Sequence, residues 1–145
     1  MFVENLKETI NLGKKFAQKL EEQSIVLLQG PIGAGKTSFV QGIAEGLFIS
    51  ESVTSPTFAL SHHYDSGTIP LIHIDLYRLE NSLLAQEFFL SEEEEANHNR
   101  AIMVVEWPQF IQPIIDNYWH IDISYAKNIG RHYKIFDPKN ALTFL

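Results

Sequence analysis

The most constraining feature of the sequence is the segment at residues 30–38, which reads Gly-Pro-Ile-Gly-Ala-Gly-Lys-Thr-Ser. It fits the pattern of a glycine, any four residues and then Gly-Lys-Ser/Thr, in which glycines let the backbone curl around an anion. The curled amides form a concave nest of N–H donors, and a following helix points its positive end into the same space. We therefore expect Lys36 to reach the outer phosphates of a nucleotide and the Thr37 hydroxyl to suit magnesium.

The residues on either side of this segment supply the context that the pattern requires. Residues 24–29 form an apolar run of the length of a strand. After the segment, Phe39, Val40, Ile43, Ala44 and Leu47 recur at helical spacing. A strand, a loop and a helix in this order favour a phosphate-binding loop over a glycine-rich turn that happens to contain a lysine.

The rest of the chain alternates between helical and strand-like patterns. An amphipathic helix is expected at residues 3–22, a hairpin of strands at 57–64 and 70–75, a mostly helical or irregular segment at 80–96, a buried strand at 101–105, a short helix at 110–115, and late strands at 119–124 and 131–136. We predict one α/β domain over residues 1–145, with the three layers of a P-loop NTPase-like fold and a central mixed sheet flanked by helices.

Composition excludes several classes of function. The net charge is −7 and the chain has only three arginines, so autonomous binding of RNA or DNA is not expected. The absence of cysteine excludes thiol catalysis, cysteine-ligated zinc and disulfides. No secretory signal is visible at the N-terminus, and no stretch approaches the roughly 18 apolar residues that a membrane span needs. The sequence is compatible with the cytoplasm, and we expect no membrane partner.

Two acidic residues follow strands and are candidates for the chemistry of phosphate transfer. Asp75 ends the strand at residues 70–75, and Glu106 follows the apolar strand at 101–105. In open α/β sheets, ligands gather outside the carboxyl ends of the strands, where the phosphate-binding loop also lies. We therefore expect both carboxylates near the phosphates, rather than as helix caps or surface charges.

Other residues allow two interpretations from sequence alone. The hydroxyls at residues 54–57 fit either a nucleotide-sensing switch or an ordinary loop ended by proline. His73 has either a polar role near the site or, more commonly, a structural hydrogen bond. Arg78 either stabilises phosphate or pairs with an acid. The acidic run at residues 92–95 is expected to be a solvated helix surface or a mobile segment.

Four segments in this order carry a family resemblance. They are Gly-x4-Gly-Lys-Thr at residues 30–37, Val-Thr-Ser-Pro-Thr-Phe at 53–58, His-Ile-Asp-Leu-Tyr-Arg-Leu at 73–79 and Val-Glu-Trp-Pro at 105–108. Together they resemble the TsaE (YjeE) family, as do Thr-Ile-Asn-Leu-Gly at 9–13 and Gly-Arg at 130–131. The chain departs from the family pattern at 86–90, where the usual Leu-Gly helix end is replaced by Gln-Glu-Phe-Phe-Leu.

The resemblance implies a small bacterial ATPase needed for threonylcarbamoyladenosine modification of tRNA, working with TsaB and TsaD proteins. Carried over by position, it implies catalytic roles for Lys36, Asp75 and Glu106, and magnesium ligation by Thr37 and Glu106. The residues implied to bind ATP are Thr9, Gly33, Ala34, Gly35, Lys36, Thr37, Ser38 and Arg131. Which of Asp75 and Glu106 would contact the metal directly stays open.

The leading hypothesis is therefore a cytoplasmic, magnesium-dependent ATPase that is slow alone, binds ATP and ADP, and depends on partners that hold the tRNA. One alternative is a small-molecule kinase on the same scaffold, although three scattered arginines leave little for an arginine-bearing lid. Another is a module in which ATP sets the affinity for a partner without being hydrolysed.

Overall fold

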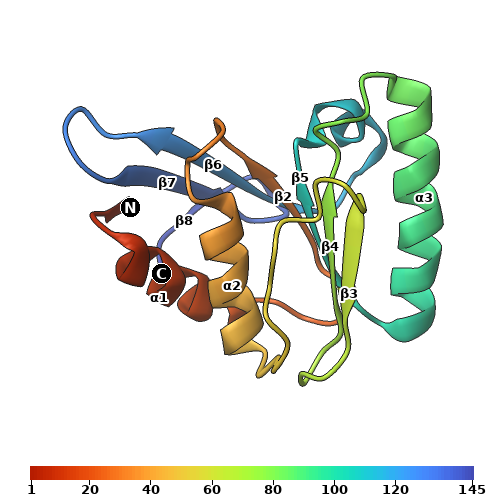
Figure 1. Ribbon diagram of the computed structural model, residues 1–145, viewed down its shortest axis with the longest axis horizontal. Helices are drawn as coiled ribbons and strands as arrows, with labels where there is room; N and C mark the ends of the chain where they lie inside the picture. The colour runs from red at the N-terminus through yellow and green to blue at the C-terminus, as the bar shows by residue number, and fades with distance from the viewer.

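The computed structural model describes residues 1–145 as an eight-stranded sheet with helices on both faces (Figure 1). The elements in chain order are β1 (Phe2–Val3), α1 (Leu6–Ala17), β2 (Ile25–Gln29), α2 (Lys36–Gly46), β3 (Ser61–Tyr64), β4 (Leu71–Asp75), α3 (Ser82–Asn99), β5 (Ile102–Glu106), the 3₁₀ turns η1 (Pro108–Phe110) and η2 (Gln112–Ile114), β6 (Trp119–Tyr125), β7 (Arg131–Phe136) and β8 (Leu142–Thr143).

The sheet is mixed, as the sequence predicts. Its strand order is β1-β7-β6-β2-β5-β4-β3, and β8 also pairs with β7. The central strands β6, β2, β5 and β4 run parallel, whereas β3, β7, β1 and β8 pair antiparallel at the two sides. Every residue of β4 and β5 is buried, because helices or turns cover both faces of this part of the sheet.

Two hydrophobic cores lie on opposite faces of the sheet and define three layers. Val26 and Leu28 of β2 contribute to the core beneath α1 and α2, whereas Leu27 points to the core beneath α3 and the 3₁₀ turns. This division follows from the alternation of side chains along a strand. Figure 1 shows α1 and α2 together on one side and α3 on the other. No helix of the chain combines the length and apolar character needed to cross a membrane.

The contact between α1 and α2 depends on glycine. A Cβ at Gly42 would lie 2.2 Å from the Ile10 carbonyl oxygen, and one at Gly13 would lie 2.4 Å from the Phe39 carbonyl oxygen. Both distances are far below van der Waals contact, so the two backbones approach each other only because these positions lack side chains. This contact fixes α2, and therefore the loop before it, against the N-terminal helix.

Several element boundaries differ from the predictions. The helix predicted at residues 3–22 is shorter, because Val3 pairs with β7 and Asn5 caps α1 by accepting a hydrogen bond from the Glu8 amide. Leu6, the first residue of α1, is exposed although it is apolar. The strand predicted at 57–64 begins only at Ser61, since residues 57–60 form a turn. The predicted helix at 110–115 is a pair of 3₁₀ turns, and β1 and β8 were not predicted.

Candidate functional site

The phosphate-binding loop joins β2 to α2, as predicted. Gly33 and Gly35 have φ values of 77° and 97°, in the left-handed region that glycine adopts without strain. Gly35 is also the N-cap of α2, which begins at Lys36. The free amides at the start of α2 therefore face the concave side of the loop, where an anion would meet the positive end of the helix.

Lys36 is buried beside the loop that precedes it. Its Nζ donates hydrogen bonds to the carbonyl oxygens of Gly30 at 2.6 Å and Pro31 at 2.9 Å. The same Nζ lies 4.4 Å from the centre of the Trp107 ring, a cation–π contact. Burial lowers the pKa of Lys36, and the carboxylates of Glu106 and Asp75 oppose this shift.

The two predicted acids lie side by side at the carboxyl ends of adjacent strands. Asp75 of β4 and Glu106 of β5 are paired in register, and both are buried. This placement follows from parallel pairing, which brings the ends of β4 and β5 to the same edge of the sheet. The expectation that both acids lie near the loop agrees with the structure, since both line the same cavity as Lys36 and Thr37.

Each acid is held by a different set of donors. His73 Nε2 donates to Glu106 Oε2 at 2.6 Å, and the His73 side chain is fully buried. Asp75 accepts hydrogen bonds at both oxygens, from the Tyr77 amide at 2.9 Å and the Thr57 hydroxyl at 3.2 Å. Burial raises the pKa of Asp75; the Glu106 charge also raises it, whereas the two hydrogen bonds lower it.

A cavity of about 500 Å³ lies between the loop and the strand ends. It is lined by the loop and the first turn of α2, by the 55–57 segment and by the strand ends: Ile32, Gly33, Gly35, Lys36, Thr37, Ser38, Ser55, Thr57, Asp75, Tyr77, Glu106 and Trp107. Hydroxyl, carboxylate and ammonium groups therefore meet around one space that also receives the amides of the loop. This is the arrangement expected of a site for phosphate groups.

A second cavity, of about 240 Å³, lies on the other side of the same loop. Thr9 and Arg131 line it, together with the N-terminal segment at residues 3–6. Gly33, Gly35 and Ser38 line both cavities. The predicted nucleotide residues are thus divided between two hollows that meet at the loop. Ala34 is buried, and the Thr9 hydroxyl donates to the carbonyl oxygen of Asn5, the N-cap of α1, at 3.2 Å.

The donors at the first cavity fit magnesium. Thr37, Asp75 and Glu106 offer hard oxygen atoms, which Mg²⁺ prefers. Because His73 binds Oε2 of Glu106, the other carboxylate oxygen is left for a metal. The chain has no cluster of three or more His, Cys, Asp or Glu side chains that could hold a metal by themselves. A magnesium ion here would therefore need phosphate oxygens and water as further ligands.

Trp107 and Tyr77 line the cavity but were not predicted. Each follows one of the predicted acids closely in the sequence, which is the signal that could have identified them. Trp107 has a φ of 56°, an uncommon value for a bulky residue, and its ring centre lies 4.9 Å from that of Tyr77. The same indole lies over the Lys36 ammonium. Such strain beside a polar cavity is typical of functional sites.

The structure shows the surroundings of the residues for which the sequence alone allows two interpretations. His73 is hydrogen-bonded and buried, and its partner is the site residue Glu106. Ser55 and Thr57 line the cavity. Arg78 pairs with no acid; its guanidinium lies 4.2 Å from the Phe58 ring centre. The acidic run is only partly solvated, because Glu92 accepts hydrogen bonds from β3.

The comparisons with known proteins identify the family. The family model described as "Threonylcarbamoyl adenosine biosynthesis protein TsaE" matches residues 3–133. The chain belongs to the TsaE family. It is 35% identical to the tRNA threonylcarbamoyladenosine biosynthesis protein TsaE of Nostoc sp. strain PCC 7120. The alignment of 135 residues covers 93% of this chain and 83% of the relative. The TsaE of Synechocystis sp. strain PCC 6803 is 42% identical over 110 residues, or 74% and 69% of the two chains.

A solved structure supports the same assignment. The crystal structure of Bacillus subtilis YdiB superposes with a TM-score of 0.74 at 29% identity, covering 92% of this chain and 80% of YdiB. The resemblance to the TsaE family and the predicted three-layer α/β fold are therefore confirmed. The protein is a member of a family of tRNA threonylcarbamoyladenosine biosynthesis proteins.

Proposed function

We propose that this TsaE-family protein is a magnesium-dependent ATP-binding protein and ATPase that supports threonylcarbamoyladenosine modification of tRNA. One observation carries the proposal: the Lys36 ammonium, the Thr37 hydroxyl and the Asp75–Glu106 pair converge on the cavity formed by the phosphate-binding loop. Phosphoryl transfer needs little covalent help from a protein, so positioned amides, a cation and metal-binding oxygens are the main requirements.

Lys36 would change partners when a nucleotide binds. Its Nζ now donates to two neutral carbonyls of its own loop. A phosphate oxygen is a charged acceptor and makes a stronger hydrogen bond with an ammonium than a carbonyl does. We therefore expect the ammonium to leave Gly30 and Pro31 and move to the outer phosphates, where it offsets the charge that develops during attack by water.

The two acids would divide the remaining work. Glu106, with one oxygen fixed by His73, would hold magnesium together with Thr37, and the metal would supply charge neutralisation on the phosphate oxygens. Asp75 already accepts two hydrogen bonds and would orient the attacking water from its fixed position. Thr9 and Arg131, at the second cavity, would contact the part of ATP that lies beyond the loop.

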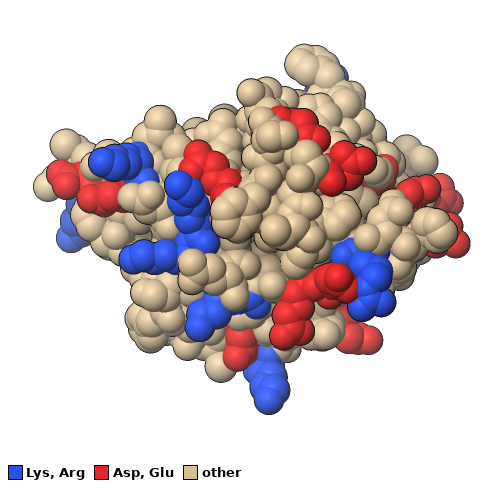
Figure 2. All heavy atoms as spheres, turned by 90° about the horizontal axis from the view of Figure 1, so that it is seen from below, with Lys and Arg blue, Asp and Glu red and all other residues tan.

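The distribution of charge supports an indirect relation to tRNA. The net charge is −7, and Figure 2 shows Lys and Arg mixed with Asp and Glu on the face that it presents. A protein that holds nucleic acid alone usually gathers basic residues in a patch or stripe. In the proposed role, TsaB and TsaD proteins in the cytoplasm hold the tRNA, and this chain binds ATP and ADP.

ATP turnover by the purified protein, with and without TsaB and TsaD, tests the proposal. We expect slow hydrolysis that rises when the partners are added. Lys36→Ala should abolish it, and Lys139→Ala, which removes an exposed lysine from a distant turn, should leave it unchanged. If the Lys36→Ala protein does not bind ATP but cells that carry this variant retain normal tRNA modification, the hypothesis that ATP is coupled to modification is wrong.

The same assays distinguish the two alternatives. Transfer of phosphate to a metabolite by the isolated chain, faster than hydrolysis, would identify a kinase. Release of the partners that proceeds equally well with a non-hydrolysable ATP analogue would identify a binding module in which hydrolysis has no part.

A further inference from the structure

Four successive carbonyl groups of the phosphate-binding loop accept hydrogen bonds from side chains. Lys36 Nζ donates to the carbonyl oxygens of Gly30 and Pro31. The Tyr125 hydroxyl donates to the Ile32 carbonyl oxygen at 2.6 Å, and Arg131 Nη2 donates to that of Gly33 at 3.3 Å. The carbonyl groups of the loop are therefore held by three side chains, two of which come from the β6–β7 hairpin.

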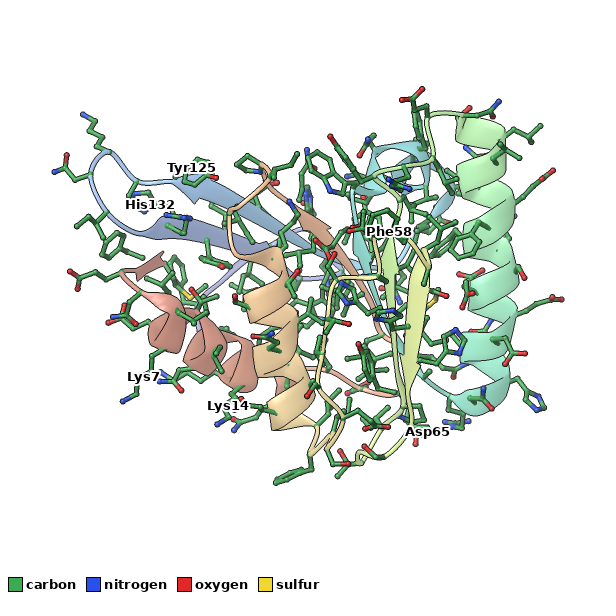
Figure 3. The ribbon with its side chains drawn as sticks, viewed as in Figure 1. Lys7, Lys14, Phe58, Asp65, Tyr125 and His132 are labelled. Atoms are coloured by element: carbon green, nitrogen blue, oxygen red, sulfur yellow. The ribbon has the colours of Figure 1, made fainter.

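The hairpin pair is built by the sheet itself. Tyr125 and Arg131 are cross-strand partners in the β6–β7 ladder, which brings the Arg131 guanidinium to 4.4 Å from the centre of the Tyr125 ring. The turn between them is closed by a hydrogen bond from the Ala126 amide to the Gly130 carbonyl oxygen. Figure 3 shows Tyr125 at the end of β6, beside the loop that leads into α2.

Holding the carbonyls controls where the amides point. In a loop that cradles an anion, the N–H groups converge on the ligand and the carbonyl groups point the other way. A donor that fixes a carbonyl therefore also fixes the amide of the same peptide plane. Gly33 lies directly under this contact, because a Cβ added to it would be 3.2 Å from the Tyr125 hydroxyl.

Lys36 and the hairpin pair of Tyr125 and Arg131 are expected to behave differently when a nucleotide binds. In the proposed function, Lys36 leaves the Gly30 and Pro31 carbonyls for the phosphates. Tyr125 and Arg131 belong to a sheet ladder and can keep the Ile32 and Gly33 carbonyls while Lys36 moves. We infer that Tyr125, together with Arg131, is a positioning residue that holds the loop in its phosphate-binding shape. This inference rests on the proposed function and adds to it a role for a residue that no motif includes.

The test replaces only the hydroxyl. Tyr125→Phe keeps the ring beneath Arg131 and removes the hydrogen bond to Ile32. Tyr118→Phe makes the same chemical change far from the loop, where the hydroxyl accepts from Gln112, and is the matched control. Affinity for ADP with magnesium is measured by calorimetry, and amide hydrogen exchange of residues 30–38 is followed in the nucleotide-free protein.

We expect Tyr125→Phe to weaken ADP binding about three- to tenfold, as loss of one hydrogen bond predicts. We also expect faster exchange at residues 30–38, and no change of either property in Tyr118→Phe. Unchanged affinity or unchanged exchange in Tyr125→Phe, while the wild-type protein binds ADP, overturns the positioning role alone. Absence of ADP binding by the wild-type protein overturns the proposed function and this inference with it.

Discussion

The buried hydrogen bond between His73 and Glu106 should both stabilise the fold and orient Glu106 for magnesium. Both side chains are almost completely buried, and His73 Nε2 lies 2.6 Å from Glu106 Oε2. We consider His73→Leu, which removes the donor and replaces the ring with an apolar side chain. The carboxylate would then lose the only side-chain donor that the structure provides for Oε2 and would stay in a site with little access to water.

The expected cost follows from the kind of hydrogen bond. One that involves a charged group contributes about 1.5–3 kcal/mol, and a buried acceptor left without its partner costs a similar amount. Taking about 2 kcal/mol, the midpoint of thermal unfolding of a chain of this length should fall by about 4–8 °C. Glu106 would also be less well oriented. We therefore expect the affinity for Mg²⁺ in the presence of ADP to fall by about tenfold or more.

Circular dichroism on heating and calorimetric ADP titrations over a series of Mg²⁺ concentrations measure the two effects. His73→Gln keeps a donor near the position of Nε2 and should recover most of both losses. His98→Leu, at an exposed site near the end of α3, is the control for losing a histidine. If His73→Leu unfolds at the wild-type temperature with the wild-type magnesium dependence, the pair does not support Glu106 as we describe.

Three further predictions concern stability. Gly42→Ala should destabilise the protein by about 2–3 kcal/mol in denaturant titrations, although alanine favours helices, because its Cβ would meet the Ile10 carbonyl. Asp75→Asn should be more stable than wild type near neutral pH, with the difference vanishing below pH 3.8. Burial raises the pKa of Asp75 in the folded protein above its ordinary value of 3.8. The free energy of unfolding of the wild type therefore falls as the pH rises from 3.8 through this raised pKa. Burial raises the pKa of Tyr133 to about 12, so between pH 10 and 12 the wild type should lose up to about 3 kcal/mol relative to Tyr133→Phe.

Features with local causes were predictable from the sequence. The loop, its flanking strand and α2 follow from one contiguous motif, and the hairpin of β3 and β4 follows from two polar-bounded strands around a turn. Asp75 and Glu106 were placed correctly because strand ends in a parallel sheet meet at one edge. Each of these inferences needed only the spacing of residues along one segment and a general rule for α/β sheets.

Features with distant causes were not predictable. Strand β1 has two residues and exists only because β7 pairs with it, so no periodicity could indicate it. The pattern of residues 3–22 therefore predicted one helix, although these residues include a strand, a cap and a helix that ends at Ala17. Tyr125 contacts the loop across 93 positions of sequence, and no spacing rule joins such residues. The partner of His73 was likewise hidden, because Glu106 lies on another strand.

The most direct test of the central claim is a calorimetric titration of the purified protein with ADP and with a non-hydrolysable ATP analogue, in the presence and absence of Mg²⁺. We predict binding at one site that is strengthened by Mg²⁺, lost in Lys36→Ala and retained in Lys139→Ala. Failure of the wild-type protein to bind either nucleotide, or binding by Lys36→Ala with wild-type affinity, would contradict the claim that the loop at residues 30–38 holds nucleotide phosphates.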